Sequence, residues 1–395
     1  MADCCIIGGG IVGLSIAREL AGRGGRVRVL AREPRRDTAS WAAAGILPPA
    51  PERPNAGPGD ALTSWSDRLH RVWARELLDE TGIDNGLRQC GGLHVGAGRA
   101  AHDRLAEEAR GWHAAGAACE PLDAPALAER EPALADAVRR GVITAGYVLP
   151  DEVQIRPPRH LAALERSCQR RGVAITHDVT VREIVVESGR ATAVVADTPS
   201  GHERIEADTW VLAAGAWSGA LAEQLGLSIV TKPVRGQIAL FSLPRPALRF
   251  VVNRGLDYLV PRDDGSLLVG STIEDAGFDR STRDDAIDRL ARVARELLGP
   301  VGLDRPSLAW AGLRPGSADG LPFIGRSPAC ANAFVATGHF RAGLHQSTGT
   351  AVLVADLVSG NDPALDVTPF DPARPAPAGG HDHVAAFVAR AAAEA

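Results

Sequence analysis

The first thirty residues show two hydrophobic periods in succession. Apolar residues are continuous over 4–7, which predicts a short buried strand, and Val12, Ile16 and Leu20 then recur at the spacing of a helix face. Glycines follow this helix, and residues 27–30 alternate like a second strand. The pattern is that of a strand, helix and strand unit of about 30 residues.

Glycines occupy the turn between the first strand and the helix, in the pattern Gly8-x-Gly10-x-x-Gly13. Gly8 permits the tight turn, Gly10 leaves the backbone open to a pyrophosphate, and Gly13 lets the helix pack on the strand. The helix N-terminus adds unpaired N–H groups and the positive end of a dipole. Because strand, glycines, helix and strand occur in this order, the sequence predicts a dinucleotide-binding site rather than an ordinary glycine-rich turn.

The rest of the chain alternates between helical and strand patterns. A proline-rich segment at 48–58 predicts a loop, and the tail beyond 369 is rich in Ala and Pro with a weak final helix. Helices are expected over 62–78, 101–115, 157–170 and 284–298, with an acidic and apolar stretch at 122–137. Strands are expected over 173–176, 179–186, 191–196, 204–205 and 210–212, in a block at 233–272, and before a helix within 333–358.

The composition is that of a globular enzyme with a large core. The 395 residues are 45% hydrophobic and 23% charged, with a formal net charge of −5 and a pI near 6.1. This slightly negative net charge favours neither nucleic acid nor an anionic membrane as a partner. Asp3 stands where a signal peptide would be basic, and no apolar run approaches the roughly 20 residues that cross a bilayer. We therefore expect a cytoplasmic protein.

The cysteines and the C-terminal histidines give no pattern of metal ligands. The six cysteines are scattered along the chain and include no CxxC pair. His381-Asp382-His383 lies in the tail, and we interpret it as solvated. The sequence predicts no bound metal.

Seven segments together resemble the FAD-dependent D-amino-acid oxidase superfamily, and within it most of all the glycine oxidases of thiamine biosynthesis. Matches that keep the same order over residues 3–360 are more specific than any one motif. The segments are GGGIVG at 8–13, AAAG at 42–45, LAAGAWS at 212–218, PVRGQ at 233–237, YLVPR at 258–262, AGLRPG at 311–316 and GHFRAG at 338–343.

The resemblance implies an α/β fold with a discontinuous, Rossmann-like FAD-binding domain and an inserted α+β substrate domain whose sheet is mostly antiparallel. The FAD-binding domain would comprise 1–50, 145–222 and 310–365, the substrate domain 51–144 and 223–309, and the C-terminal tail 366–395.

The resemblance also implies how FAD is held. Small residues at 42–46 would border the flavin, because larger side chains would displace a planar ring, and a helix at 347–357 would direct its positive end at it. Relatives with covalent flavin carry a cysteine near 310–314, and none is present here, so we expect noncovalent FAD. The predicted cofactor-binding residues are Gly8, Gly10, Ile11, Val12, Gly13, Arg32, Glu33, Ala43, Ala44, Gly45, Val179, Ala214, Gly215, Trp217, Gly312, Arg314, Gly338, His339, Phe340, Arg341, Ala342 and Gly343.

Three residues are predicted to bind substrate. Arg314 resembles the family arginine that grips the substrate carboxylate, and a guanidinium matches a carboxylate bidentately. Tyr258 stands where the family places a strand tyrosine whose hydroxyl reaches the same carboxylate. Arg341 either touches substrate or closes the flavin-proximal loop, and the sequence does not decide between these roles.

The sequence departs from the family at the expected adenosine ribose anchor. Relatives end the second strand with an acidic residue, whereas this chain has Ala31. Either Glu33 replaces it, or backbone and water hold the ribose. Ile46, Thr348 and Gly349 also differ from common family residues, so substrate preference cannot be transferred directly.

The implied reaction is FAD-dependent oxidative deamination of glycine, sarcosine or a small D-amino acid. Hydride would pass to flavin N5, and O2 would reoxidise the flavin to give hydrogen peroxide. The alternatives are an amine or amino-acid oxidase or dehydrogenase with a larger substrate, and a flavin-binding protein without turnover, which an intact Arg314 and Tyr258 disfavour. The expected partners are the amino acid and O2, a second copy in a homo-oligomer, and a thiazole synthase that receives the imine.

Overall fold

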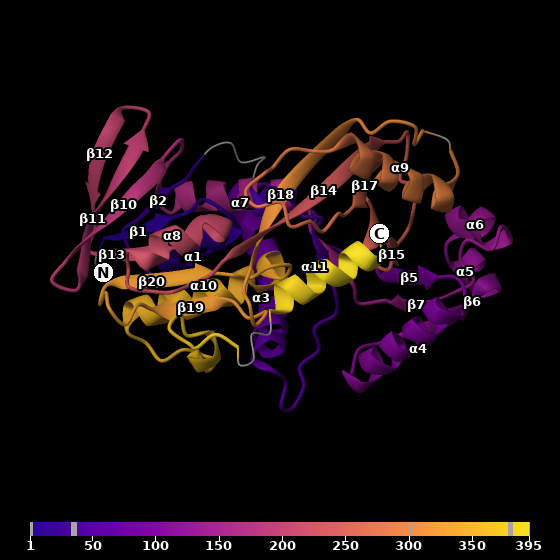
Figure 1. Ribbon diagram of the computed structural model, residues 1–395, viewed down its shortest axis with the longest axis horizontal. Helices are drawn as coiled ribbons and strands as arrows, with labels where there is room; N and C mark the ends of the chain where they lie inside the picture. Colours follow the sequence, from indigo (N-terminus) through magenta and orange to yellow (C-terminus); the bar gives the residue numbers. More distant parts are fainter. Residues whose placement is uncertain (1–2, 33–37, 301, 378–381, 395) are drawn as a thin grey trace.

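The strand, helix and strand unit predicted at the N-terminus lies at the centre of a mostly parallel sheet (Figure 1). The structure is a computed structural model, and it describes residues 3–32, 38–300, 302–377 and 382–394. Within these residues the sheet has the order β19-β20-β13-β1-β2-β9, and only β19 is antiparallel to its neighbour. Its strands are β1 (Cys4–Ile7), β2 (Val27–Leu30), β9 (Ala174–Thr176), β13 (Thr209–Leu212), β19 (Phe323–Arg326) and β20 (Ala333–Thr337).

Both faces of this parallel sheet are covered, which explains the continuous apolar run of β1. Cys4 and Ile6 pack against a helical layer, and Cys5 and Ile7 pack against the opposite layer. The helical layer contains α1 (Ile11–Gly22), α3 (Pro58–Thr81), α7 (Pro157–Arg170) and α10 (Gly343–Ser359). The opposite layer contains α8 (Ser218–Glu223) and the antiparallel strands β10 (Thr180–Glu187), β11 (Arg190–Thr198) and β12 (Gly201–Glu206).

A larger sheet forms the other half of the molecule (Figure 1). In the described part of the chain its order is β18-β14-β17-β16-β15-β5-β7-β6, antiparallel except between β15 and β5. The strands are β5 (Gly92–Gly96), β6 (Glu120–Asp123), β7 (Ala145–Leu149), β14 (Lys232–Ser242), β15 (Val251–Arg254), β16 (Asp257–Pro261), β17 (Ser266–Gly270) and β18 (Leu308–Gly316). The associated helices are α4 (Arg99–Ala114), α5 (Ala124–Arg130), α6 (Ala135–Arg139) and α9 (Asp284–Leu298).

Short elements connect the two halves. The strands β3 (Ile46–Leu47) and β4 (Arg88–Gln89) both pair with β8 (Val153–Gln154), which lies between them, and α2 (Ala39–Ala42) packs on β18. No helix among the described residues combines the length and the apolar composition needed to cross a bilayer.

The predicted α/β class, with a Rossmann-like unit and a mostly antiparallel second sheet, is confirmed, but the predicted start of one helix is wrong. α10 begins at Gly343, not at 347, and the N–H of Gln346 already donates to the carbonyl of Ala342 at 2.8 Å. Leu344 is the single apolar residue of its first two turns, so no apolar period marks the beginning of the helix.

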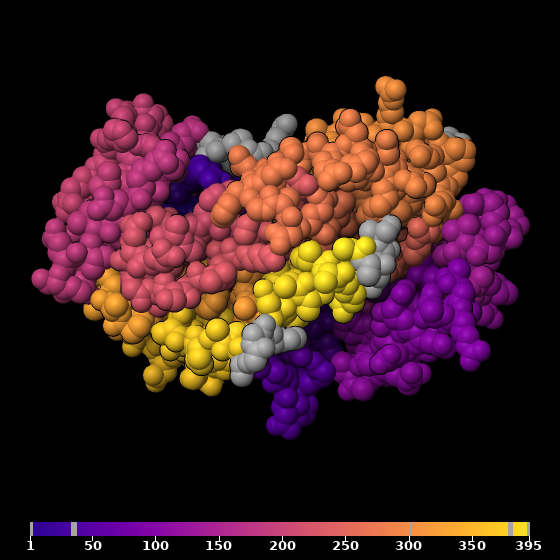
Figure 2. Space-filling view, viewed as in Figure 1, coloured from indigo at the N-terminus to yellow at the C-terminus, as the bar shows by residue number. Residues whose placement is uncertain are grey.

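The weak final helix predicted for the tail is present among residues 382–394, and His383, which we interpreted as solvated, is exposed. These residues include α11 (His383–Glu394), in which Val384, Phe387 and Ala391 form a buried stripe. Figure 2 shows this helix, in yellow, lying across the face of the molecule between its two halves. The burial of this stripe was not predicted, because the alanines and prolines of the tail conceal its apolar positions at helical spacing. His381 lies outside the described residues.

The sheets also suggest how the domain boundaries should be drawn. β7 and β18 begin within or close to segments assigned to the FAD-binding domain, yet both pair in the larger sheet. α3 lies in a segment assigned to the substrate domain, yet it packs on α10 and α7. We therefore propose that 58–81 belongs with the parallel sheet, and that β7 and β18 belong with the larger one.

Candidate functional site

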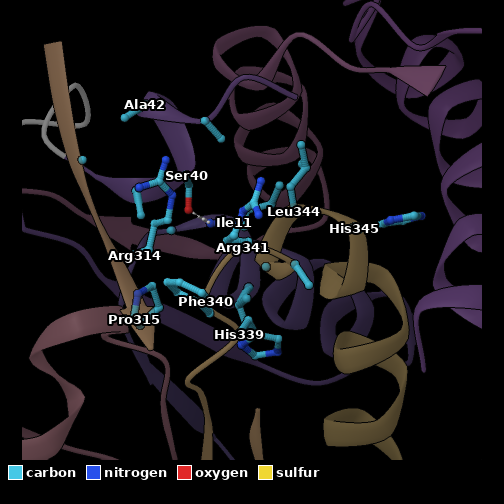
Figure 3. A pocket seen from close by; sticks show the side chains of 18 of the residues that line it. Ile11, Ser40, Ala42, Arg314, Pro315, His339, Phe340, Arg341, Leu344 and His345 are labelled. Atoms are coloured by element: carbon cyan, nitrogen blue, oxygen red, sulfur yellow. Dashed lines mark hydrogen bonds between the residues drawn. The ribbon is translucent and has the colours of Figure 1, made fainter. Parts of the chain in front are cut away.

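A cavity of about 1300 Å³ lies at the carboxyl ends of the parallel strands and reaches the face of the larger sheet (Figure 3). The residues that follow β1, β2, β13 and β20 line it, as expected for a ligand site of a doubly wound sheet. β16 and β18 supply the wall on the other side. The cavity therefore joins the dinucleotide-binding turn to the predicted substrate residues.

The glycine-rich turn has the geometry that its sequence predicts. Gly8 has a φ of +128°, and a β-carbon there would collide with the carbonyl of Ala213. A β-carbon at Gly13 would collide with the carbonyl of Gly8, so this position sets the contact between helix and strand. The N–H of Ile11 donates to Ser40 Oγ at 2.9 Å, a contact that sequence reasoning did not find.

The segment at 42–45 forms a wall of small residues. A β-carbon at Gly312 would lie 2.6 Å from the β-carbon of Ala42, so β18 approaches this wall closely. Trp310 Nε1 donates to the carbonyl of Ala42 at 3.2 Å, and Arg262 Nη2 donates to that of Ala44 at 2.6 Å. Burial lowers the pKa of Arg262 to about 10. The Arg262 side chain therefore positions the wall of small residues, a role that the sequence did not reveal.

At the other end of the cavity, Arg314 and Tyr258 rest on glycines of neighbouring strands. A β-carbon at Gly236 would collide with the Arg314 guanidinium, and one at Gly270 would lie 2.6 Å from the Tyr258 hydroxyl oxygen. Arg314 Nη2 donates to Ser271 Oγ at 2.8 Å, and Arg314 Nη1 donates to the carbonyl of Thr272 at 3.3 Å. The two glycines thus allow both side chains to lie flat against the sheet.

Arg341 adds a second guanidinium to this end of the cavity (Figure 3). Desolvation within the cavity and the nearby charge of Arg314 lower the pKa of Arg341 to about 10, while part of its side chain stays exposed to solvent. Burial also lowers the pKa of Arg314 and raises that of Tyr258, whose phenol therefore stays neutral. Within residues 3–32, 38–300, 302–377 and 382–394, no carboxylate lies within ion-pair distance of Arg314 or Arg341. Among these residues, the two guanidiniums at this end of the cavity thus have no carboxylate within ion-pair distance, which favours an anionic ligand between them.

The structure brings most of the predicted residues together. Gly13 and Gly338 do not line the cavity; they shape the backbone beside it, and Gly338 has a φ of +81°. Glu33 lies outside the described residues, so its role stays a prediction. The cavity is lined by Gly8, Gly10, Ile11, Val12, Arg32, Ala43, Ala44, Gly45, Val179, Ala214, Gly215, Trp217, Tyr258, Gly312, Arg314, His339, Phe340, Arg341, Ala342 and Gly343.

Other lining residues were missed because they depend on strand register. Asn253 lies opposite Tyr258, and His94 lies opposite Asn253, so the three share one face of the larger sheet. The side chain of Asn253 lies 3.3 Å from His94 Nε2, and its Nδ2 donates to Glu152 Oε1 at 3.2 Å. These residues extend the cavity beyond the predicted carboxylate anchor.

The cavity fits an extended dinucleotide together with a small ligand. Its volume exceeds the roughly 300–1,000 Å³ of most small-molecule sites. The glycine turn at the N-terminus of α1 suits a pyrophosphate, and the small wall at 42–45 suits a planar ring. Ala31 is buried, and a β-carbon at Gly9 would lie 2.5 Å from the β-carbon of Ala31. Since the alanine side chain has no polar group, Ala31 cannot bind a ribose hydroxyl through its side chain.

Comparisons with known proteins agree with this fit. Residues 3–357 match the family DAO, described as FAD dependent oxidoreductase. The chain is 34% identical to a glycine oxidase of Pseudomonas aeruginosa over 373 residues, covering 93% of this chain and 98% of that protein. It is 33% identical to the bifunctional protein ThiO/ThiG of a Synechocystis species, covering 94% of this chain and 54% of that protein.

The fold comparison gives the same result. The crystal structure of glycine oxidase from Geobacillus kaustophilus matches with a TM-score of 0.84 at 32% identity, covering 95% of this chain and 99% of that one. The family resemblance predicted from the sequence is confirmed. This chain belongs to the DAO family of FAD-dependent oxidoreductases.

Proposed function

We propose that this protein oxidises the amine of glycine, or of a similarly small amino acid such as sarcosine or a small D-amino acid. The observation that carries the proposal is the pair of guanidiniums, Arg314 and Arg341, which lie beside the neutral hydroxyl of Tyr258 and have no ion-pair partner among the described residues. A carboxylate is the anion that such a group binds bidentately. The relatives named glycine oxidase support the same substrate class.

The residues of this chain bind and orient the substrate. Arg314, fixed by Ser271 Oγ, and Tyr258, fixed above Gly270, direct the carboxylate to the larger sheet. The α-carbon then lies toward the wall at 42–45. When bound, FAD supplies the hydride acceptor for the α C–H, and its reoxidation by O2 would yield hydrogen peroxide. Burial lowers the pKa of His339 to about 3, so its ring adds no positive charge beside the site.

A rapid-mixing experiment tests the proposal. Purified holoenzyme is mixed anaerobically with glycine, sarcosine and D-alanine, the flavin absorbance is followed, and peroxide is assayed after O2 is admitted. We expect bleaching and then peroxide. Arg314→Ala should weaken substrate binding by about 2–5 kcal/mol with FAD content unchanged, and the exposed Arg110→Ala is the matched control. Bleaching that saturates at the same glycine concentration in Arg314→Ala would refute the carboxylate assignment.

One observation favours a second candidate, an amine or amino-acid oxidase or dehydrogenase with a larger substrate. The cavity continues past Tyr258 to Asn253, His94 and Glu152, which glycine bound at Arg314 would leave empty. Neighbouring strands are about 4.8 Å apart, so His94 lies roughly 10 Å from the Tyr258 backbone across the sheet. A faster reduction by long amino acids than by glycine would favour this candidate.

The partners and the compartment are also part of the proposal. The ThiO/ThiG relative joins two activities in one chain, which supports transfer of the imine product from this protein to a thiazole synthase. All six cysteines are free thiols, in keeping with the reducing environment of a cytoplasmic protein. A homo-oligomer is the expected assembly.

A further inference from the structure

For Arg341, a residue of the proposed carboxylate site, the sequence leaves two roles open: contact with the substrate, or closure of the flavin-proximal loop. Among the described residues its guanidinium has no hydrogen bond or ion pair with another side chain, unlike Arg314, which Ser271 holds. The Arg341 side chain is exposed at the cavity and the positive charge of Arg314 lies nearby, so an anion that binds both guanidiniums relieves their repulsion. Something other than hydrogen bonds must therefore keep Arg341 directed into the cavity.

The contact that does so comes from the C-terminal helix. Arg341 Cζ lies 5.0 Å from the centroid of the Phe387 ring, within the range of a cation–π interaction. The Phe387 ring also packs edge to face on Phe340, with centroids 5.5 Å apart and planes at 87°. Arg390 Cζ lies 5.1 Å from the same ring. One buried phenylalanine thus touches two consecutive residues of the cavity wall.

α11 is itself fixed beside the strand that carries Arg314. Val384 is fully buried, and a β-carbon at Gly316, near the end of β18, would lie 2.6 Å from Val384 Cγ2. The N–H of His383 donates to the carbonyl of Ala318 at 2.7 Å, and the N–H of Ala385 donates to Asp382 Oδ1 at 2.9 Å. Figure 2 shows α11 lying across the junction of the two halves. The helix therefore has a defined position relative to both arginines.

We propose that α11 is a substrate-positioning element, in which Phe387 holds the Arg341 guanidinium toward the carboxylate that Arg314 binds. Arg341 then contacts the substrate, and the loop at 338–342 is held by the tail of the chain. Arg390 on the same ring adds positive charge near the mouth of the site. This inference rests on the proposed function for the identity of the anion, and it predicts that changes in α11 alter substrate binding before they alter FAD content.

Two substitutions at Phe387 distinguish the effect of its aromatic ring from the effect of its apolar volume. Phe387→Trp keeps an aromatic face, whereas Phe387→Leu keeps an apolar side chain without one. The readout is the dissociation constant of acetate, a carboxylate without an amine, measured from the change that it causes in the flavin spectrum of the holoenzyme. Because Phe387→Leu removes the cation–π contact, it should weaken acetate binding about 2- to 30-fold, and Phe387→Trp should leave it near the wild-type value. Ala389→Ser, on the exposed side of α11, is the control.

A double-mutant cycle with Arg341→Gln tests whether Phe387 acts through Arg341. In the Arg341→Gln protein, Phe387→Leu should no longer change the acetate constant. With glycine as substrate, Phe387→Leu should raise KM more than it lowers kcat. Equal effects in both backgrounds, loss of FAD in step with loss of acetate binding, or no effect of Phe387→Leu would overturn the proposal. If no amino acid bleaches the flavin but acetate binding still depends on Phe387 through Arg341, the proposed function fails and this inference stands.

Discussion

Acid should destabilise this protein at a pH well above the titration of its carboxylates, because three buried histidines are neutral in the folded state. Burial lowers the pKa of His70 to about 4 and those of His160 and His339 to about 3. In the unfolded chain each titrates near 6.5. Since the folded pKa is the lower one, their contribution to stability is present above about pH 6.5 and is lost as the pH falls toward 3–4.

The expected loss follows from these values. At pH 5 a histidine with an unfolded pKa near 6.5 and a folded pKa of 3–4 lowers the free energy of unfolding by about 2 kcal/mol. The three together therefore remove roughly 6 kcal/mol, which is a large part of the 5–15 kcal/mol that stabilises a typical domain. Few carboxylates change protonation between pH 7 and 5, so this interval isolates the histidines.

Urea unfolding of the holoenzyme at fixed FAD, followed by tryptophan fluorescence at pH 7, 6 and 5, measures this loss. His160→Gln removes one titrating ring, so its loss between pH 7 and 5 should be smaller by about 2 kcal/mol. His113→Gln is the control, because this ring is exposed on α4. A wild-type protein whose free energy of unfolding changes by less than about 1 kcal/mol over this interval would show that these rings are not held neutral by burial.

Three further outcomes are expected. Gly236→Ala should displace the Arg314 guanidinium and raise KM for glycine at least about 30-fold with FAD retained. The control is Gly57→Ala, because a β-carbon there meets nothing within 4 Å and KM should not change. An unchanged steady-state KM in Gly236→Ala would contradict the position of Arg314 flat against β14. Arg262→Gln should weaken FAD binding about 10-fold in a fluorescence titration of apoprotein, since it loses the charged donor to Ala44, and wild-type affinity would show that the wall is held without it. Acid precipitation should release the yellow colour into the supernatant, and a coloured pellet would indicate covalent flavin.

Local patterns were enough to predict most elements, because each depends on the spacing of nearby residues. The helix predicted at 284–298 is α9 with the same bounds, since its apolar positions recur at one period and Gly299 ends it. The glycine turn was equally clear. Arg314 and Tyr258 were identified only through the family resemblance, as nothing local distinguishes a cavity arginine from a surface one.

The parts that could not be predicted depend on contacts between distant segments. Asn253 and His94 enter the cavity wall because β15 pairs with β5 in one register, which neither strand specifies alone. Arg262 reaches Ala44 across more than two hundred residues of chain. The burial of α11 likewise depends on distant contacts: Val384 packs against Gly316, and the N–H of His383 donates to the carbonyl of Ala318.

The strand order of the parallel sheet also constrains when the protein can fold during its synthesis. β1 leaves the ribosome first, but its partner β13 follows some two hundred residues later, and β20 is completed only at Thr337. Until then β1 can pair only with β2, and β13, once made, can pair only with β1, and contacts so distant in sequence form slowly. A ribosome-bound chain ending at residue 300 still lacks β19, β20 and α10, so protease should cleave it within β13, where the released protein resists.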